Sequence, residues 1–146
     1  MANSRTPAAA AVAAAHESLL DEHRALRALL GRLREVQDPV GLVAALDDLH
    51  GKLKAHIEHE EFPGGLYESM GALGPQYASE VRQLVDEHYR FLATVRSLAD
   101  EARGAPAPLE PRILEGAVAL AAQVQSHEAI EHQLAERILA ERQAAN

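Results

Sequence analysis

Apolar residues recur every three or four positions along most of the chain, in stretches that three groups of Pro and Gly residues separate. These breaks are DPVG at 38–41, the segment from PGG to GP at 63–75, and GAPAPLEP at 104–111. A spacing of three or four keeps side chains on one helical face, and Pro and Gly interrupt helices. The pattern therefore predicts an all-α fold, an up-down-up-down four-helix bundle.

Each predicted helix has one row of residues that faces the expected core. In chain order the rows are Leu19, His23, Leu26, Leu30 and Leu33; Leu42, Leu46, Leu49, Leu53, His56 and Glu60; Val81, Leu84, His88, Phe91, Val95 and Leu98; and Ile113, Ala117, Leu120, Val124, His127, Glu131, Leu134 and Ile138. A lone core histidine is usually satisfied by hydrogen bonds. Six polar residues on four helices are costly to bury unpaired, so we predict that they share a site.

The polar residues follow an internal two-fold repeat of helix pairs. LLDEHRALRALLGRL (19–33) matches LVDEHYRFLATVRSL (84–98), and LHGKLKAHIEHEE (49–61) matches LAAQVQSHEAIEH (120–132). Each pair thus supplies one His from its first helix and an H-x-x-x-E set from its second. Four residues along a helix rise about 6 Å and rotate about 40°, so both can face one metal pair. Two such sets predict a dinuclear centre, close to the 62–75 connection.

Composition restricts the chemistry and the partners. With no Cys, thiolate metal sites and cysteine nucleophiles are excluded, so a metal must be held by His and carboxylate. A formal charge of -8 argues against nucleic acid and anionic membranes as partners. Aromatic residues make up only 3% of the 146 residues, which is typical of a helical bundle rather than a sheet protein.

The Ala-rich N-terminus is expected to be a disordered lead-in over residues 1–13, followed by a single domain over 14–146. Its alanine run lacks leucine and has only Arg5 upstream, unlike an export signal. No stretch approaches the roughly 20 apolar residues that span a bilayer. We therefore expect a cytoplasmic protein.

Two competing metal motifs fail on spacing. HEAIEH (127–132) places its histidines five apart, whereas the zinc-protease motif needs them four apart. Ferritin-like di-iron sites need Glu three residues before His, and no histidine of this chain has one.

The residues resemble the hemerythrin-like HHE cation-binding domain family over about residues 16–142. The resemblance rests on the repeated E-H (22–23 and 87–88), on H-x-x-x-E-E before Phe62 and Pro63, and on the second H-x-x-x-E. It implies a four-helix bundle with two iron ions, non-haem and oxo-bridged. In that family carboxylates bridge the irons and histidines are terminal ligands. Carried over, Glu60 and Glu131 would bridge, and His23, His56, His88 and His127 would be terminal.

The chain departs from the oxygen-carrying members, which have five histidines, including H-x-x-x-H on the third helix. Here Leu92 follows His88 at that spacing, and the fourth helix has Glu at four rather than Asp at five. A missing ligand leaves more open metal positions, which favours turnover of hydrogen peroxide, nitric oxide or oxygen over carriage. Tyr67, in the connection near the site, is a further candidate ligand.

The remaining polar residues have less specific interpretations. His16 is expected at the end of the bundle, His50 and His132 in solvent, and Glu61 and Glu128 at the surface or behind a ligand. His59 is a candidate to support a ligand, and Tyr89 is expected to pack between helices unless it ligates iron. The preferred function is a peroxide-consuming, catalase-like or detoxifying di-iron oxidoreductase. The alternatives are an oxygen- or iron-responsive sensor without turnover and a purely structural bundle.

Overall fold

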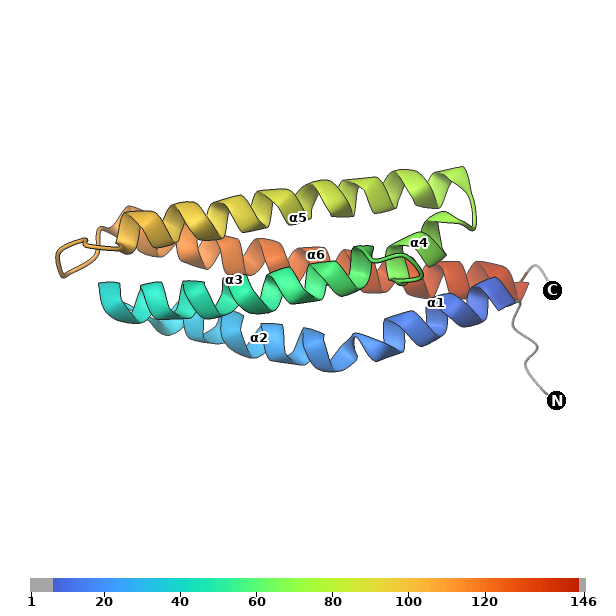
Figure 1. The fold of residues 1–146 in the computed structure, drawn as a ribbon, viewed down its shortest axis with the longest axis horizontal. Helices are drawn as coiled ribbons and strands as arrows, with labels where there is room; N and C mark the ends of the chain where they lie inside the picture. Colours follow the sequence, from blue (N-terminus) through green and yellow to red (C-terminus); the bar gives the residue numbers. More distant parts are fainter. Residues whose placement is uncertain (1–6, 145–146) are drawn as a thin grey trace.

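The computed structural model describes residues 7–144 of the chain, which form helices and the turns between them. The helices are α1 (Pro7–Ser18), α2 (Leu20–Glu35), α3 (Pro39–Glu61), α4 (Leu66–Gly71), α5 (Pro75–Ala102) and α6 (Pro111–Ala144). Figure 1 shows α2, α3, α5 and α6 running along one axis, with α1 and α4 gathered towards one end.

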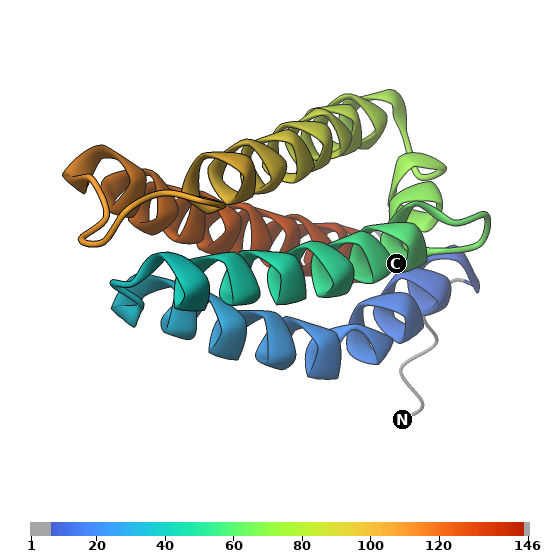
Figure 2. The same cartoon turned by 60° about the vertical axis from the view of Figure 1, so that its left-hand side comes forward.

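The four bundle helices close a ring in chain order. α2 packs against α3, α3 against α5, α5 against α6, and α6 against α2. Figures 1 and 2 show that chain neighbours in this ring run in opposite directions. The predicted up-down-up-down four-helix bundle is therefore confirmed.

Helix α3 begins inside a segment that the sequence predicted to be a break. The Asp38 carboxylate accepts a 2.8 Å hydrogen bond from the backbone N–H of Gly41, and Pro39 follows at the first helical position. Both features are favourable at a helix N-terminus. The break at 38–41 is thus shorter than expected, since only residues 36–38 link α2 to α3.

The predicted core rows are buried, with Val81 half-buried as the one exception. Their apolar members form two clusters. The larger cluster fills the bundle from Leu26 to Val124, and the smaller one includes Leu19, Leu84 and Leu134 beside residues of α1 and α4. On α2, α5 and α6 the polar positions fall between members of the two clusters. The polar site is therefore enclosed by apolar packing on both sides.

The expected disordered lead-in over residues 1–13 is wrong for residues 7–13, which belong to α1; residues 1–6 lie outside the described part. Alanine has the highest helix propensity, which favours this segment locally. Val12 is fully buried and packs in the smaller cluster, where α1 contacts α4 and α6. Tertiary contacts of a few small apolar residues therefore extend the domain towards the N-terminus.

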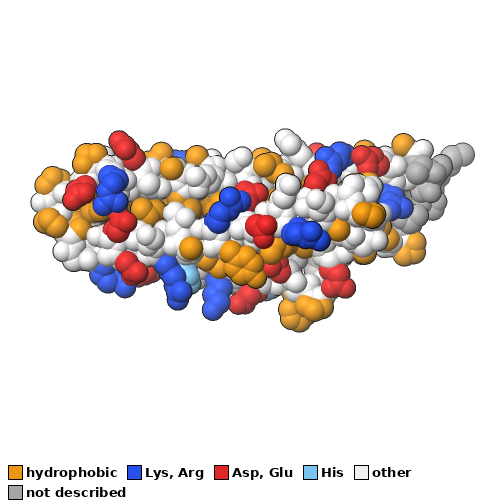
Figure 3. All heavy atoms as spheres, turned by 90° about the horizontal axis from the view of Figure 1, so that it is seen from above, with side chains coloured by type: hydrophobic (Ala, Val, Ile, Leu, Met, Phe, Trp, Pro, Cys, Tyr) orange, Lys and Arg blue, Asp and Glu red, His pale blue; other side chains and the backbone are white. Residues whose placement is uncertain are grey.

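The surface and the helix lengths add two observations. On the face seen in Figure 3, Lys and Arg side chains are interspersed with Asp and Glu side chains. Among residues 7–144, no helix combines the length and apolar composition that crossing a membrane requires.

Candidate metal centre

All four bundle helices contribute to one buried polar cluster. α2 supplies His23, α5 supplies His88, and α3 and α6 each supply a His and a Glu, one turn apart: His56, Glu60, His127 and Glu131. None of these six residues is more than 6% exposed, and both glutamates are completely buried. The structure therefore brings together every polar residue of the predicted core rows.

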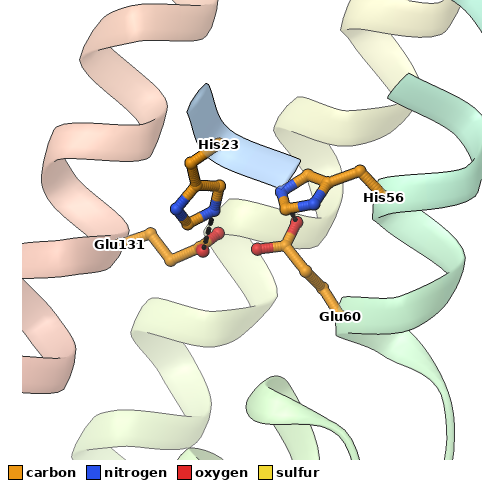
Figure 4. Close-up of side chains that lie close together, drawn as sticks. All are labelled: His23, His56, Glu60 and Glu131. Atoms are coloured by element: carbon orange, nitrogen blue, oxygen red, sulfur yellow. Dashed lines mark ion pairs between the residues drawn. The ribbon is translucent and has the colours of Figure 1, made fainter. Parts of the chain in front are cut away.

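The cluster consists of two ligand sets that share both carboxylates. One set is His23, His56, Glu60 and Glu131, and the other is Glu60, His88, His127 and Glu131. In each set, every residue offers one nitrogen or oxygen atom, and these four atoms all lie within 4.8 Å of one another. Figure 4 shows the first set, in which both imidazoles point at the carboxylates. The arrangement has the two-fold character that the sequence repeat predicted.

The two glutamates lie between the histidines of the two sets. Oε1 of Glu60 is 3.2 Å from Nε2 of His56 and 3.3 Å from Nε2 of His88. Glu131 directs Oε1 to Nε2 of His23, at 3.4 Å, and Oε2 to Nε2 of His127, at 3.7 Å. Each carboxylate thus faces both sets, as a ligand that bridges two metal ions must.

Several buried atoms of the cluster have no hydrogen-bond partner. They include Nε2 of His23, both carboxylate oxygens of Glu60 and Oε1 of Glu131. Leaving such groups unsatisfied costs free energy that a bound cation would recover. Imidazole nitrogen and carboxylate oxygen together suit iron and other first-row metals. The donor set therefore fits two metal ions that share Glu60 and Glu131.

A carboxylate lies near Nδ1 of three of the four histidines. Oε2 of Glu22 is 2.8 Å from Nδ1 of His56, and Oε2 of Glu61 is 3.0 Å from Nδ1 of His88. An oxygen of Glu87 lies 3.7 Å from Nδ1 of His127, which is beyond hydrogen-bond distance. A carboxylate at Nδ1 orients the ring and leaves the Nε2 lone pair for a metal.

The positions of Glu22 and Glu87 beside these histidines were not predicted from the sequence. Each precedes the histidine of its own helix, yet it contacts the histidine of the next helix in its pair. The doubled E-H was the available signal, because the Glu recurs with the His in both repeats.

Burial controls the protonation of three of the four histidines. It lowers the pKa of His88 to about 4, and burial together with His88 lowers the pKa of His127 to about 4. Burial also lowers the pKa of His56, despite its contact with Glu22. These imidazoles are neutral at pH 7, which is the form that binds a metal.

The two shared carboxyls have opposite pKa shifts. Burial and the charge of Glu131 raise the pKa of Glu60 well above its usual value. Burial acts in the same direction on Glu131, but its close contacts with Glu60 and His23 outweigh it and hold the pKa of Glu131 below its usual range. Two close carboxyls that share one proton behave in this way.

Tyr67 approaches the second ligand set from α4. Its hydroxyl donates a 2.8 Å hydrogen bond to Oε2 of Glu131 and lies 3.0 Å from Nε2 of His88. Nε2 of His127 is 3.4 Å away. Burial, and then the charges of Glu131 and Glu60, raise the pKa of Tyr67 far above its usual value, so the phenol keeps its proton. The structure places this oxygen beside the set of His88 and His127.

The other candidates occupy different positions. Tyr89 is 66% exposed, so the expectation that it packs between helices is wrong, and its side chain lies outside the buried cluster. His59 is exposed and contacts Glu22, which in turn contacts His56. His50 is half-buried rather than solvated, whereas His132 is exposed as expected. Glu128 is half-buried and lines a cleft with His23.

Comparison with known families agrees with this geometry. The hemerythrin HHE cation-binding domain model matches residues 14–144. The chain belongs to the hemerythrin family. The searches of curated proteins and of solved structures each returned no match. With its buried His and Glu sets, this hemerythrin domain is a metal-binding domain.

The departure at Leu92 has a structural counterpart in this hemerythrin domain. Leu92 follows His88 by one helical turn, is half-buried and packs against the larger apolar cluster. It offers no donor atom. Tyr67 instead brings an oxygen to the side of the cluster where His88 and His127 lie.

Proposed function

We propose that the protein is a non-haem di-iron protein that consumes hydrogen peroxide. His23 and His56 would hold one iron ion, His88 and His127 would hold the other, and both ions would share Glu60 and Glu131. The observation that carries this proposal is the pair of ligand sets that share two fully buried carboxylates.

Tyr67 is proposed as a ligand of the iron held by His88 and His127. Its hydroxyl is already within 3.0 Å of His88 Nε2 and donates to Glu131. A metal ion lowers the pKa of a coordinating group, which would offset the opposite effect of burial. The phenolate oxygen would then take a position on the metal that Leu92, which has no donor atom, cannot fill.

The proposed reaction is the conversion of two hydrogen peroxide molecules into one oxygen and two water molecules. It balances without a further reductant or oxidant. The iron pair supplies the two-electron redox capacity and open ligand positions. The chain keeps His88 and His127 neutral by burial, and it orients His56 and His88 through Glu22 and Glu61. Four histidines leave more of the metal coordination open than five, which supports turnover rather than storage of oxygen, whereas a bound Tyr67 would close one of these positions and slow the turnover.

Oxygen evolution from hydrogen peroxide tests this proposal. The iron-loaded protein should evolve oxygen faster than the same concentration of free iron and faster than His88→Ala. The iron(II) protein, exposed to oxygen, should give no reversible oxygen spectrum. Peroxide loss no faster than in both controls, combined with a reversible oxygen spectrum, would overturn turnover and favour carriage or sensing. The rate of nitric oxide loss, measured against the same two controls, decides whether nitric oxide is a substrate as well.

A further inference from the structure

A second histidine pair lies at the surface, outside the buried cluster. Nε2 of His16, on α1, is 2.9 Å from Nδ1 of His132, on α6, although the two residues are 116 positions apart. Their ring centroids are 4.8 Å apart, with a 38° angle between the planes. His16 is half-buried and the His132 side chain is 47% exposed, so the pair is open to solvent on one side.

The two nitrogens share a hydrogen bond, and their spacing also suits adjacent ligands of one metal ion. Two nitrogens about 2.05 Å from a metal are about 2.9 Å apart when the angle at the metal is a right angle, and about 3.3 Å apart in a tetrahedral site. The observed separation equals the right-angle value, which is the geometry of octahedral or square-planar ions. Divalent iron, cobalt, nickel and copper accept it with water in the remaining positions.

Glu136 prepares His132 for this role. Its Oε1 lies 3.1 Å from Nε2 of His132, one helical turn away on α6. A carboxylate at one ring nitrogen fixes the proton there and leaves the lone pair on the other. Nδ1 of His132 would therefore accept the hydrogen bond from His16, and its lone pair is the one that a metal ion would use.

A cleft runs between His132 of this pair and His23 of the buried cluster. It has a volume of about 320 Å³, and both His132 and His23 line it. Glu128 lines the same cleft and has a buried carboxylate oxygen, Oε1, without a hydrogen-bond partner. Oxygen and nitrogen donors thus occur along the cleft from His132 to His23.

We propose that His16 and His132 bind a divalent first-row metal ion at the surface, and that the ion held there supplies the buried cluster through the cleft. The surface site stands on its own geometry. The supply step rests on the proposed di-iron function.

Nickel titration of the iron-loaded protein tests the surface site. The wild type should bind one additional Ni²⁺ per chain, measured by isothermal titration calorimetry. His16→Ala should abolish this binding, and Glu136→Gln should weaken it about tenfold. His50→Ala is the matched control and should bind Ni²⁺ as the wild type does. Binding that is absent from the wild type, or unchanged in His16→Ala, overturns the site; circular dichroism confirms that each variant is folded.

The rate of iron loading tests the supply step. Metal-free His16→Ala and His132→Ala should take up iron(II) several-fold more slowly than the wild type and His50→Ala, yet reach the same final iron content. Equal rates overturn the supply step. A wild type that binds no iron in its buried cluster overturns the proposed function instead, while the nickel titration still decides the surface site.

Discussion

Oε2 of Glu22 lies 2.8 Å from Nδ1 of His56, although the two residues are 34 positions apart and on different helices. The contact crosses from α2 to α3 and fixes an imidazole whose other nitrogen faces Glu60. Support of this kind orients a ligand before any metal binds, and its loss typically costs 10- to 100-fold in metal affinity.

Glu22→Ala should therefore weaken iron binding about tenfold without removing a ligand. The measurement is competition with a chelator of known affinity. Glu58→Ala is the matched control, because Glu58 is an exposed glutamate on α3. Equal affinities in the two variants would show that Glu22 does not support the site.

Loss of a proposed ligand should have a larger effect. His88→Ala and Glu131→Ala should lower the iron content from about two ions to below one per chain, since each removes a buried donor. His50→Ala and His132→Ala should keep the wild-type content, because both lie outside the two ligand sets. Equal iron content in all four variants would contradict the ligand assignment.

Tyr67→Phe should change the visible spectrum of the iron(III) protein. An iron-bound phenolate gives a charge-transfer band, which the variant would lose along with the 2.8 Å contact to Glu131. Tyr77→Phe is the control, since its hydroxyl donates to Glu141 rather than to the cluster. An unchanged spectrum in Tyr67→Phe would exclude Tyr67 as a ligand.

The stability of the metal-free protein should depend on pH through His127. Burial, and then His88, lower its folded pKa to about 4 from the ordinary 6.5. Between these values only the unfolded state binds the proton, so the free energy of unfolding falls as pH falls, by about 1.4 kcal/mol per pH unit for one histidine.

His127→Gln removes this titration and should lose less stability than the wild type between pH 6.5 and pH 4. Chemical denaturation at several pH values measures the difference. Glu60, whose raised pKa acts in the opposite direction, is present in both proteins. Parallel stability curves for the two proteins would contradict a neutral, buried His127.

The sequence was sufficient to locate the six buried polar residues because each occupies a core position of a periodic helix. His23 and Glu131 could be placed in the core from spacing alone, without knowing how the helices pack. The same periodicity predicted the bundle and its order. These features depend on local repeats, which a single sequence contains.

Other features depend on how the helices are rotated against one another. Glu22 and Glu87 lie beside the core rows, and only the packing of each helix pair turns them towards a histidine of the next helix. α1 likewise has small apolar residues whose burial requires α4 and α6. Tyr89 follows a core histidine directly, but this position turns it towards solvent.

Metal analysis of the protein produced in iron-replete medium tests the central claim most directly. The account predicts about two iron ions per chain, because two ligand sets share Glu60 and Glu131. A ratio near one ion, or zinc that persists under iron-replete conditions, would contradict the di-iron centre.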